Sequence, residues 1–378
     1  MTNRTETNSL IIVAFHAPTT SGCDYATQTI ELLEKNNSTI GFVLGEPITW
    51  KDIFLSYRKK SIVEKIYQHT LFRPFFILPG QRIMVIKQMN YFINAMLLNI
   101  YVSLFHPQKK KYFWFFEPFF MPIFLPIFSS YITVFDCVDY FFSTQQPFRS
   151  HLLYSLHYAK HIFANSIALK NQMQRYRPDV SVVPLGFADR LFRYLRTKKI
   201  TKHKTLRVGF IGGIDGRIDY SLLFQVATAL PNVEFVFIGT NHYGSVGFPP
   251  SVKRFFSLPN VHHQEEVAKS FIPEILSTFD IGIIPYNIKQ SFNRFCFPMK
   301  LLEYFFVGLP VISTNIEEMK EYQDLVIVIK TSQEMILAIN RIKEQGWDKK
   351  KKLRQRTIAL QHSWEHKIRT IQKAIGSA

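Results

Sequence analysis

The chain has 378 residues, which is more than one hydrophobic core usually organises, so two domains are expected. Hydrophobic residues make up 47% of the chain and charged residues 20%, which excludes an intrinsically disordered protein. The formal net charge of +18 favours anionic partners, whereas three widely separated cysteines exclude a disulfide framework and a cysteine zinc site and fit a reducing cytoplasm.

The first half of the chain has the pattern of a parallel α/β sheet. An apolar strand is predicted at residues 10–15, a helix at 25–35 and a second strand at 39–44. Further strands are predicted at 75–78, 83–86, 112–116, 132–135, 161–164 and 180–183, with helices at 88–105 and 167–176. Residues 51–69 are predicted to form a basic amphipathic helix, which either faces water or lies on an anionic membrane surface.

The longest apolar stretch, residues 112–135, is long enough to cross a membrane. It contains Pro118, Pro122 and Pro126, and prolines at this spacing break a helix. We therefore predict a strand, an irregular loop and a second strand here rather than a spanning helix.

A second α/β unit is predicted after a basic linker at 193–204. Strands are predicted at 206–211, 233–238, 261–263, 281–284 and 310–313, with helices at 220–230, 269–279 and 299–307. The expected domains are 1–192 and 205–360, followed at 361–378 by a last amphipathic helix that could pack on either domain. The fold class is thus α/β with two Rossmann-like domains.

A glycine-containing loop follows the first strand of the second domain. Gly212 and Gly213 would let a phosphate approach the backbone, and Arg217 would clamp a diphosphate with two hydrogen bonds. Glycines that only turn the chain are the alternative.

A second candidate binding segment begins with Pro298, a residue favoured in the first turn of a helix. Free amides at this helix start would attract an anion, beside which Lys300 would be stabilised, while Glu303 would accept hydrogen bonds from ribose hydroxyls. An ordinary exposed lysine–glutamate pair is the alternative. Together the two segments describe a site for a nucleoside diphosphate.

These residues resemble a known family. The pattern Pro298-x-Lys300-x-x-Glu303-Tyr304, followed by Gly308-x-Pro310, resembles the nucleotide-sugar signature of GT-B glycosyltransferases of family 4 and their relatives in bacterial polysaccharide and teichuronic acid synthesis. Residues 208–219, 183–187 and 135–139 are similar to other segments of that family. Residues 362–365 resemble the start of the family's final helix, which implies that the helix within 361–378 crosses back to the first domain.

The resemblance implies a GT-B fold whose two domains face each other across a cleft. It implies a nucleotide-diphosphate sugar as co-substrate, no cofactor and no metal, and a hexosyltransferase type of reaction without a covalent intermediate. The donor-binding residues would be Gly212, Gly213, Arg217, Pro298, Lys300, Leu301 and Glu303. One position departs from the family, because Phe295 stands where many members have a glutamate near the transferred sugar.

Candidate catalytic residues follow strands of the first domain, where open α/β sheets place their functional groups. They are His16, Asp136 and Asp139. A structural hydrogen bond from His16 and capping of a turn by the two aspartates are the alternatives.

The function predicted from these residues is transfer of a sugar from a nucleotide-diphosphate donor to a glycan or polyprenyl-linked acceptor in cell-surface polysaccharide synthesis. The expected location is the cytoplasm, with peripheral attachment to the inner face of the cell membrane as a possibility. The alternative is a non-catalytic protein that binds polyanions or nucleotides on a degenerate GT-B fold. No RNA-binding motif or zinc spacing supports a nucleic-acid partner.

Overall fold

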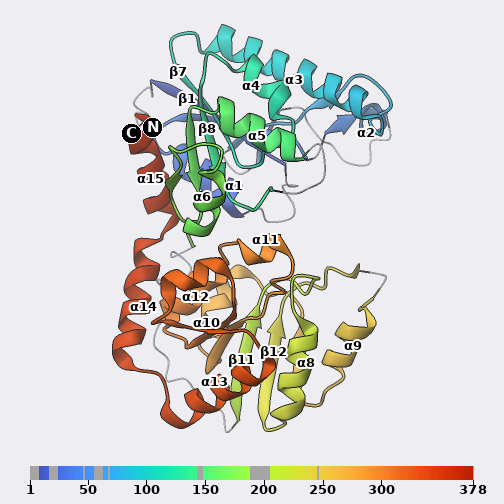
Figure 1. The fold of residues 1–378 in the computed structure, drawn as a ribbon. Helices are drawn as coiled ribbons and strands as arrows, with labels where there is room; N and C mark the ends of the chain where they lie inside the picture. Colours follow the sequence, from blue (N-terminus) through green and yellow to red (C-terminus); the bar gives the residue numbers. More distant parts are fainter. Residues whose placement is uncertain are drawn as a thin grey trace. The chain divides into compact units, whose positions relative to one another are not determined.

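The computed structural model describes residues 8–16, 24–45, 47–54, 63–66, 69–142, 148–187, 205–244 and 247–377. The chain divides into two units, of which unit 1 comprises Met1–Pro184 and Trp364–Ala378 and unit 2 comprises Leu185–Ser363 (Figure 1). The last helix, α15 (Trp364–Ile375), therefore belongs to unit 1 although it follows unit 2 in the chain. The basic linker predicted at 193–204 lies outside the described residues.

Unit 1 is built on an eight-stranded sheet in the order β10-β9-β8-β7-β1-β2-β5-β4, in which only the β4–β5 pair is antiparallel. Its strands are β1 (Ser9–Phe15), β2 (Ser38–Val43), β4 (Val63–Ile66), β5 (His69–Phe72), β7 (Lys110–Phe115), β8 (Ile132–Cys137), β9 (His161–Ala164) and β10 (Ser181–Val182). The short strands β3 (Ile48–Thr49) and β6 (Phe75–Phe76) pair separately. Its helices, besides α15, are α1 (Asp24–Leu33), α2 (Trp50–Phe54), α3 (Met84–Phe105), α4 (Met121–Ile127), α5 (Phe148–Tyr158) and α6 (Ile167–Met173).

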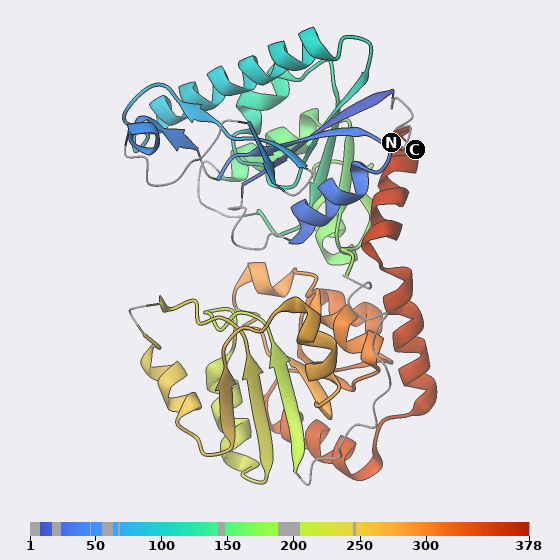
Figure 2. The same cartoon turned by 180° about the vertical axis from the view of Figure 1, so that it is seen from behind.

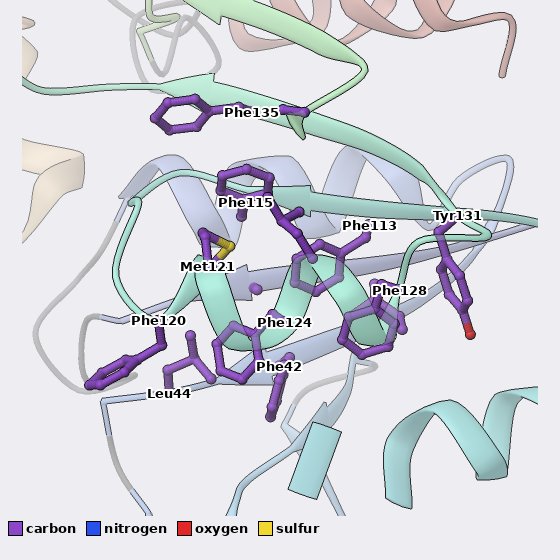
Figure 3. Close-up of a cluster of buried hydrophobic side chains, with 14 of the residues drawn as sticks. Phe42, Leu44, Phe113, Phe115, Phe120, Met121, Phe124, Phe128, Tyr131 and Phe135 are labelled. Atoms are coloured by element: carbon purple, nitrogen blue, oxygen red, sulfur yellow. The ribbon is translucent and has the colours of Figure 1, made fainter. Parts of the chain in front are cut away.

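Aromatic side chains form much of the core of unit 1. Figure 3 shows phenylalanine rings from β2, β7, α4 and β8 gathered into one cluster. The rings of Phe113 and Phe128 stack with centroids 4.5 Å apart, and those of Phe115 and Phe135 stack at 4.8 Å. Such pairs add specific geometry to the free energy gained by burying large apolar surfaces. The high phenylalanine content is thus largely used inside the protein.

Three predictions for unit 1 were wrong in detail. The loop expected between β7 and β8 contains the helix α4, which tolerates Pro122 because it lies in the first turn, where a proline's missing amide costs nothing. The strand expected at 83–86 is instead the start of α3, with Ile83 as its cap residue. The helix expected over 51–69 ends at Phe54, and residues 63–66 pair with β5 as a strand; residues 55–62 and 67–68 lie outside the described part.

Unit 2 contains a six-stranded parallel sheet in the order β13-β12-β11-β14-β15-β16. Its strands are β11 (Leu206–Ile211), β12 (Val233–Ile238), β13 (Val261–Gln264), β14 (Ile281–Ile284), β15 (Val311–Thr314) and β16 (Val326–Ile329). Its helices are α8 (Tyr220–Ala229), α9 (Pro250–Phe256), α10 (Ile272–Leu276), α11 (Ser291–Arg294), α12 (Lys300–Val307), α13 (Ser332–Gln345) and α14 (Lys349–Gln361), with 3-10 turns η3 (Lys269–Phe271) and η4 (Glu317–Tyr322). Numbered within the unit, this order is 3-2-1-4-5-6, the order of a Rossmann fold.

Glycines let helices and loops approach the central strands of unit 2. A Cβ added at Gly282 in β14 would lie 2.6 Å from the ring of Tyr304 on α12. A Cβ at Gly209 in β11 would lie 2.1 Å from the ring of Phe279. The helix α12 ends at Gly308, whose φ of 71° gives the left-handed cap that was predicted. These contacts hold α12 against the strands that carry the site.

Among the described residues, no helix combines the length and the apolar character that crossing a membrane requires.

Candidate functional site

Among the parallel strands of each unit, the order of the strands along the sheet reverses direction at one place. In unit 2 this place lies between β11 and β14, and in unit 1 it lies between β1 and β7. Loops that follow the two strands at such a point diverge to opposite faces of the sheet and leave room for a ligand at the carboxyl edge. The predicted site residues in each unit can therefore be located relative to this point.

The loop after β11 packs its backbone closely against the end of β12. A Cβ added at Gly239 would lie 2.0 Å from the carbonyl oxygen of Gly212, and both glycines have positive φ values. A Cβ at Gly213 would meet the ring of His242 at 2.6 Å. Gly212 and Gly213 thus both have a structural reason to lack a side chain. This agrees in part with the alternative, in which these glycines only turn the chain.

Lys300 reaches from α12 to the end of β11. Its ammonium nitrogen would lie 3.2 Å from a Cβ at Gly212, so the structure brings these two predicted residues together. The ammonium donates to the Tyr286 hydroxyl at 2.5 Å and lies over the rings of Phe210 and Tyr286 at 4.5 and 4.7 Å. Among the described residues these contacts include no carboxylate. Lys300 therefore does not form the surface pair with Glu303 that was the alternative.

Arg217 shares the ring of Tyr286 with Lys300. Its guanidinium carbon lies 4.5 Å from the Tyr286 centroid and 4.7 Å from that of Phe292. Its Nε donates to the Oδ1 of the fully buried Asn293 at 2.9 Å. Two cations on one aromatic ring repel each other, and the electron-rich ring faces offset only part of that repulsion. The arrangement favours a bound anion with more than one negative charge.

Asn293 connects the loop after β11 to the loop after β14 by hydrogen bonds. Its amide donates to the carbonyl oxygens of Arg217 and Asn287 and to the side chain of Gln290, at 3.0–3.1 Å. The backbone amide of Asn287 also donates to the carbonyl of Arg217 at 2.7 Å. Because all these groups are satisfied within the protein, Asn293 fixes the position of Arg217 before any ligand binds.

The start of α12 contains residues that were predicted to bind an anion. These residues differ in how accessible they are to a ligand. The cap residue Met299 makes no side-chain hydrogen bond to the first turn. Leu301 is fully buried and its amide donates to the carbonyl of Pro298, which is itself buried. Leu301 thus supports the helix start through its buried side chain, and its predicted role in donor binding stays a prediction. Glu303 is half-buried one turn further on.

The departure at Phe295 leaves an aromatic, half-buried side chain after α11. The neighbouring Arg294 lies over its ring at 5.5 Å and forms an ion pair with Glu317 at 2.8 Å. Lys320 forms a second ion pair with the same glutamate at 2.5 Å. Glu317 is therefore committed to two cations and does not replace the missing family glutamate.

In unit 1, three titratable side chains follow adjacent strands at the carboxyl edge. His16 follows β1, Glu117 follows β7 and Asp139 follows β8. His16 and Asp139 were predicted, whereas Glu117 was not predicted as a site residue. The predicted Asp136, which lies within β8 three residues before Asp139, does not join them.

Glu117 is nearly buried and its carboxylate accepts a hydrogen bond from the Tyr25 hydroxyl. Burial raises the pKa of Glu117 to about 7, and the nearby charge of Asp139 adds to the rise, while the bonds from Tyr25 and from the backbone amides of His16 and Glu117 oppose it. Burial and the charge of Lys87 lower the pKa of His16 to about 4, so its ring is neutral near pH 7. A carboxyl group that titrates near pH 7 is suited to exchange a proton with a substrate hydroxyl.

The ring of His16 lies between two aromatic side chains, at 5.5 Å from Phe119 and 5.8 Å from Phe120. Phe120 has a φ of 60°, the one positive φ among the described residues that are not glycine. This conformation costs a phenylalanine on the order of 1 kcal/mol, and such strain is concentrated at functional sites. The strained residue lies directly beside the predicted histidine.

Asp136 is fully buried, and Lys367 on α15 donates to its Oδ1 at 2.7 Å. Burial raises the pKa of Asp136, and the ammonium of Lys367, also buried, opposes that rise. A carboxylate with no solvent access and a buried cationic partner cannot meet a substrate, so the catalytic role predicted for Asp136 is corrected to a structural one. The pair links the last helix to the sheet of unit 1.

Several residues of the two sites were missed because ordinary core residues have the same sequence signals. Phe210 lies in the apolar strand β11, Tyr286 follows the apolar strand β14 by two residues, and Asn293 lies in the short helix α11. Only their position at the switch point separates them from the core. Among the described residues, no group of three or more histidine, cysteine, aspartate or glutamate side chains is arranged to hold a metal ion.

Sequence comparison finds a family model that matches part of the second unit and a curated relative of the chain. Residues 205–345 match the family model described as Glycosyl transferases group 1. Over 177 residues the chain is 31% identical to the Bacillus subtilis (strain 168) protein named "Putative teichuronic acid biosynthesis glycosyltransferase TuaH". That match covers 45% of this chain and 43% of the relative, so the chain spans less than half the length of the curated relative it matches.

Solved structures resemble the whole chain. Anabaena Alr3699/HepE in complex with UDP-glucose has a TM-score of 0.72 at 13% identity, covering 98% of this chain and 100% of that one. Sucrose-phosphate synthase from Thermosynechococcus elongatus has a TM-score of 0.70 at 12% identity, covering 97% and 98%. The UDP-forming α,α-trehalose-phosphate synthase from Burkholderia vietnamiensis has a TM-score of 0.69 at 12% identity, covering 99% of both chains. The chain therefore has the fold of the GT-B glycosyltransferases and contains, in residues 205–345, a glycosyl transferases group 1 domain.

Proposed function

We propose that the protein is a glycosyltransferase that moves a hexose from a nucleotide-diphosphate donor to a glycan or polyprenyl-linked acceptor in cell-surface polysaccharide synthesis. The observation that carries the proposal is the pair of cations, Lys300 and Arg217, on the ring of Tyr286 at the switch point of unit 2. A nucleoside diphosphate supplies the multiple negative charge that this pair favours.

Further support comes from the named relatives. One solved neighbour holds UDP-glucose, and a second structure of that protein holds UDP and glucose. The curated relative takes its name from teichuronic acid biosynthesis, which is the formation of a cell-surface polysaccharide. We include a nucleotide-sugar donor and a role in polysaccharide synthesis in the proposal for this chain. We also propose a cytoplasmic location at the inner face of the membrane.

In the proposed reaction, the bond between the anomeric carbon and the diphosphate oxygen breaks, and its electron pair remains on the diphosphate. Lys300 and Arg217 stabilise that developing charge, each by about 2–4 kcal/mol in the transition state. The acceptor oxygen forms the new bond to the anomeric carbon. Its proton passes to Glu117, whose pKa of about 7 suits that exchange.

We propose that the reaction needs no metal ion, because Lys300 and Arg217 can stabilise the diphosphate charge that a divalent cation stabilises in other transferases. Turnover is then expected to persist in EDTA. Complete loss of turnover in EDTA, restored by magnesium or manganese, would contradict this part of the proposal and leave the transfer reaction standing.

The donor site is tested by measuring which nucleotide sugar raises the melting temperature of the protein. Glu303→Ala is expected to weaken nucleoside-diphosphate binding by about 1.5–3 kcal/mol, because a charged hydrogen bond to ribose is lost. Glu344→Ala, at an exposed position of α13 in the same unit, is the matched control and should bind as the wild type does. Equal affinities for the wild type and both variants would remove Glu303 from the site.

The second candidate function is a non-catalytic protein that binds nucleotides or polyanions. Phe295 favours it, because a family residue near the transferred sugar is missing and Glu317 does not replace it. The two functions are separated by release of nucleoside diphosphate from the bound donor in the presence of glycan or lipid-linked acceptors. Tight donor binding without any release would favour the second function.

A further inference from the structure

The long helix α3 has an apolar face that its own unit leaves uncovered. Ten apolar or aromatic side chains on α3 are between 37% and 69% exposed. They are Met84, Val85, Met89, Phe92, Met96, Leu97, Ile100, Tyr101, Leu104 and Phe105. Ser103 is the one polar residue among the exposed positions of this helix, all of whose residues the structure describes. A helix facing water would normally carry polar residues here.

The exposed and buried residues of α3 lie on opposite sides of the helix. Tyr91, Asn94, Ala95, Leu98 and Val102 are buried and follow helical spacing. Asn90 and Asn94 on the buried side exchange hydrogen bonds with the backbone of Leu78 and Phe75. The stripe Val85–Met89–Phe92–Met96–Ile100 follows the same spacing on the other side. Figures 1 and 2 show α3 along the outer side of unit 1.

The charged residues that flank α3 in the sequence are all of one sign. No aspartate or glutamate occurs in the sequence between Glu64 and Glu117. The exposed Arg82 precedes the helix, and Lys109, Lys110 and Lys111 follow it, with Lys110 exposed. The apolar stripe is thus bracketed by cations at both ends, the arrangement of helices that lie in the headgroup layer of an anionic membrane.

We propose that the outer face of α3 binds the surface of an anionic lipid membrane. The apolar stripe enters the boundary between headgroups and acyl chains, and Arg82 and the lysines at 109–111 contact lipid phosphates. The helix lies on the membrane and does not cross it, because its other side is packed against the core of unit 1. This surface replaces residues 51–69, for which a continuous helix was wrongly predicted.

Charge argues against a second copy of the chain as the occupant. In an antiparallel pair of α3 helices, Arg82 of each would approach the lysines at 109–111 of the other, and in a parallel pair the like ends would meet. Either arrangement brings like charges together at both ends, which opposes association. An anionic lipid surface attracts both ends at once. The inference rests on the proposed function only to explain why the protein would bind a membrane, since a lipid-linked acceptor is found at such a surface.

The test is flotation of the full-length protein with vesicles of phosphatidylcholine alone and of phosphatidylcholine mixed with phosphatidylglycerol. We expect binding to the mixed vesicles at low salt, weaker binding at high salt, and little binding to phosphatidylcholine. The variant Phe92→Gln/Met96→Gln/Ile100→Gln should lower partitioning on the order of a hundredfold, because three half-exposed apolar side chains are lost. Glutamine keeps the helix propensity of α3 high.

The matched control is Leu337→Gln/Leu353→Gln/Leu360→Gln, which removes three similarly exposed leucines from α13 and α14 of unit 2. It should float as the wild type does. Wild-type protein that stays unbound, or an α3 variant that floats like the wild type, overturns the proposal. So does sedimentation showing a wild-type dimer that the α3 variant abolishes, because α3 would then join two copies.

Donor binding and transfer to a soluble acceptor, measured without vesicles, keep the two proposals apart. The α3 variant should retain the melting-temperature shift with a nucleotide sugar, since the residues of that site belong to unit 2. Flotation without any response to nucleotide sugars would overturn the proposed function and support the membrane surface. A response to nucleotide sugars without flotation would support the proposed function and overturn the membrane surface.

Discussion

The switch points of the two units carry opposite kinds of charge. In unit 2 the side chains at this edge are the cations Lys300 and Arg217, held on aromatic rings. In unit 1 they are the carboxylates of Glu117 and Asp139 beside a histidine. The same topology therefore presents one edge suited to an anion that gains charge and another suited to a hydroxyl that loses a proton.

Burial affects the two edges differently. In unit 1 it raises the pKa of Glu117 to about 7 and lowers that of His16 to about 4, so it moves both groups toward their neutral forms. In unit 2 the cations lie against ring faces and a hydroxyl, which tolerate positive charge without neutralising it. The comparison suggests that unit 1 acts through protons and unit 2 through fixed charge, and each side can be tested separately.

The largest effect is expected at Glu117. Glu117→Gln should lower turnover on the order of 10²- to 10⁴-fold, because the group proposed to take the acceptor's proton is lost. Wild-type turnover should rise with pH through about 7, as Glu117 becomes ionised, and the variant should lack that rise. Turnover is measured as release of nucleoside diphosphate across the pH range.

The same variant should become more stable as its activity falls. The folded pKa of Glu117 is raised above the ordinary value of 4.5, so the stability contributed by the protonated form is complete below about pH 4.5 and is lost as the pH rises through about 7. Glutamine stays neutral, so the variant should gain at most about 3 kcal/mol over the wild type above pH 7. Full activity in the variant, or lower stability at pH 8, would contradict this assignment.

The next largest effect concerns the structural role assigned to Asp136. Lys367→Met should destabilise unit 1 by about 3–5 kcal/mol, because it leaves the buried carboxylate of Asp136 without its cation. The double variant Asp136→Asn/Lys367→Met should recover much of that loss, since neither charge remains. Urea unfolding of the three proteins measures both values. A double variant no more stable than the single one would show that the carboxylate is not the source of the loss.

A smaller effect is expected at the cation edge of unit 2. Lys300→Met keeps the aliphatic stem and removes the charge, so turnover should fall on the order of 10²- to 10³-fold while the fold is retained. Lys351→Met is the control, because Lys351 also lies over an aromatic ring, that of Trp347, at 4.7 Å. If both variants lose activity equally, the effect comes from lysine–aromatic packing and not from a charge at the donor.

The donor edge was easier to predict than the acceptor edge for a physical reason. Lys300 and Glu303 lie one turn apart on a single helix, and Gly212, Gly213 and Arg217 lie on a single loop, so local sequence contains most of that site. The residues of the unit 1 edge are each on a different strand end, separated by about a hundred residues between His16 and Glu117. Nothing in local sequence distinguished Glu117 from Asp136. Both carboxylates are buried, and only the tertiary structure shows that Glu117 accepts from the Tyr25 hydroxyl whereas Asp136 accepts from the Lys367 ammonium.

Local hydrophobic pattern by itself determined the α/β class, the two successive units and most strand positions, because strand and helix periodicities are properties of neighbouring residues. Tertiary structure alone decided that Lys367 neutralises Asp136 and that one face of α3 has no cover within its unit. Each of these depends on which surfaces meet, and an apolar residue has the same sequence signal whether its side chain is packed or exposed. Contacts between distant segments therefore decided which side chains of the predicted elements are packed, paired or exposed. Sequence periodicity does not specify those contacts.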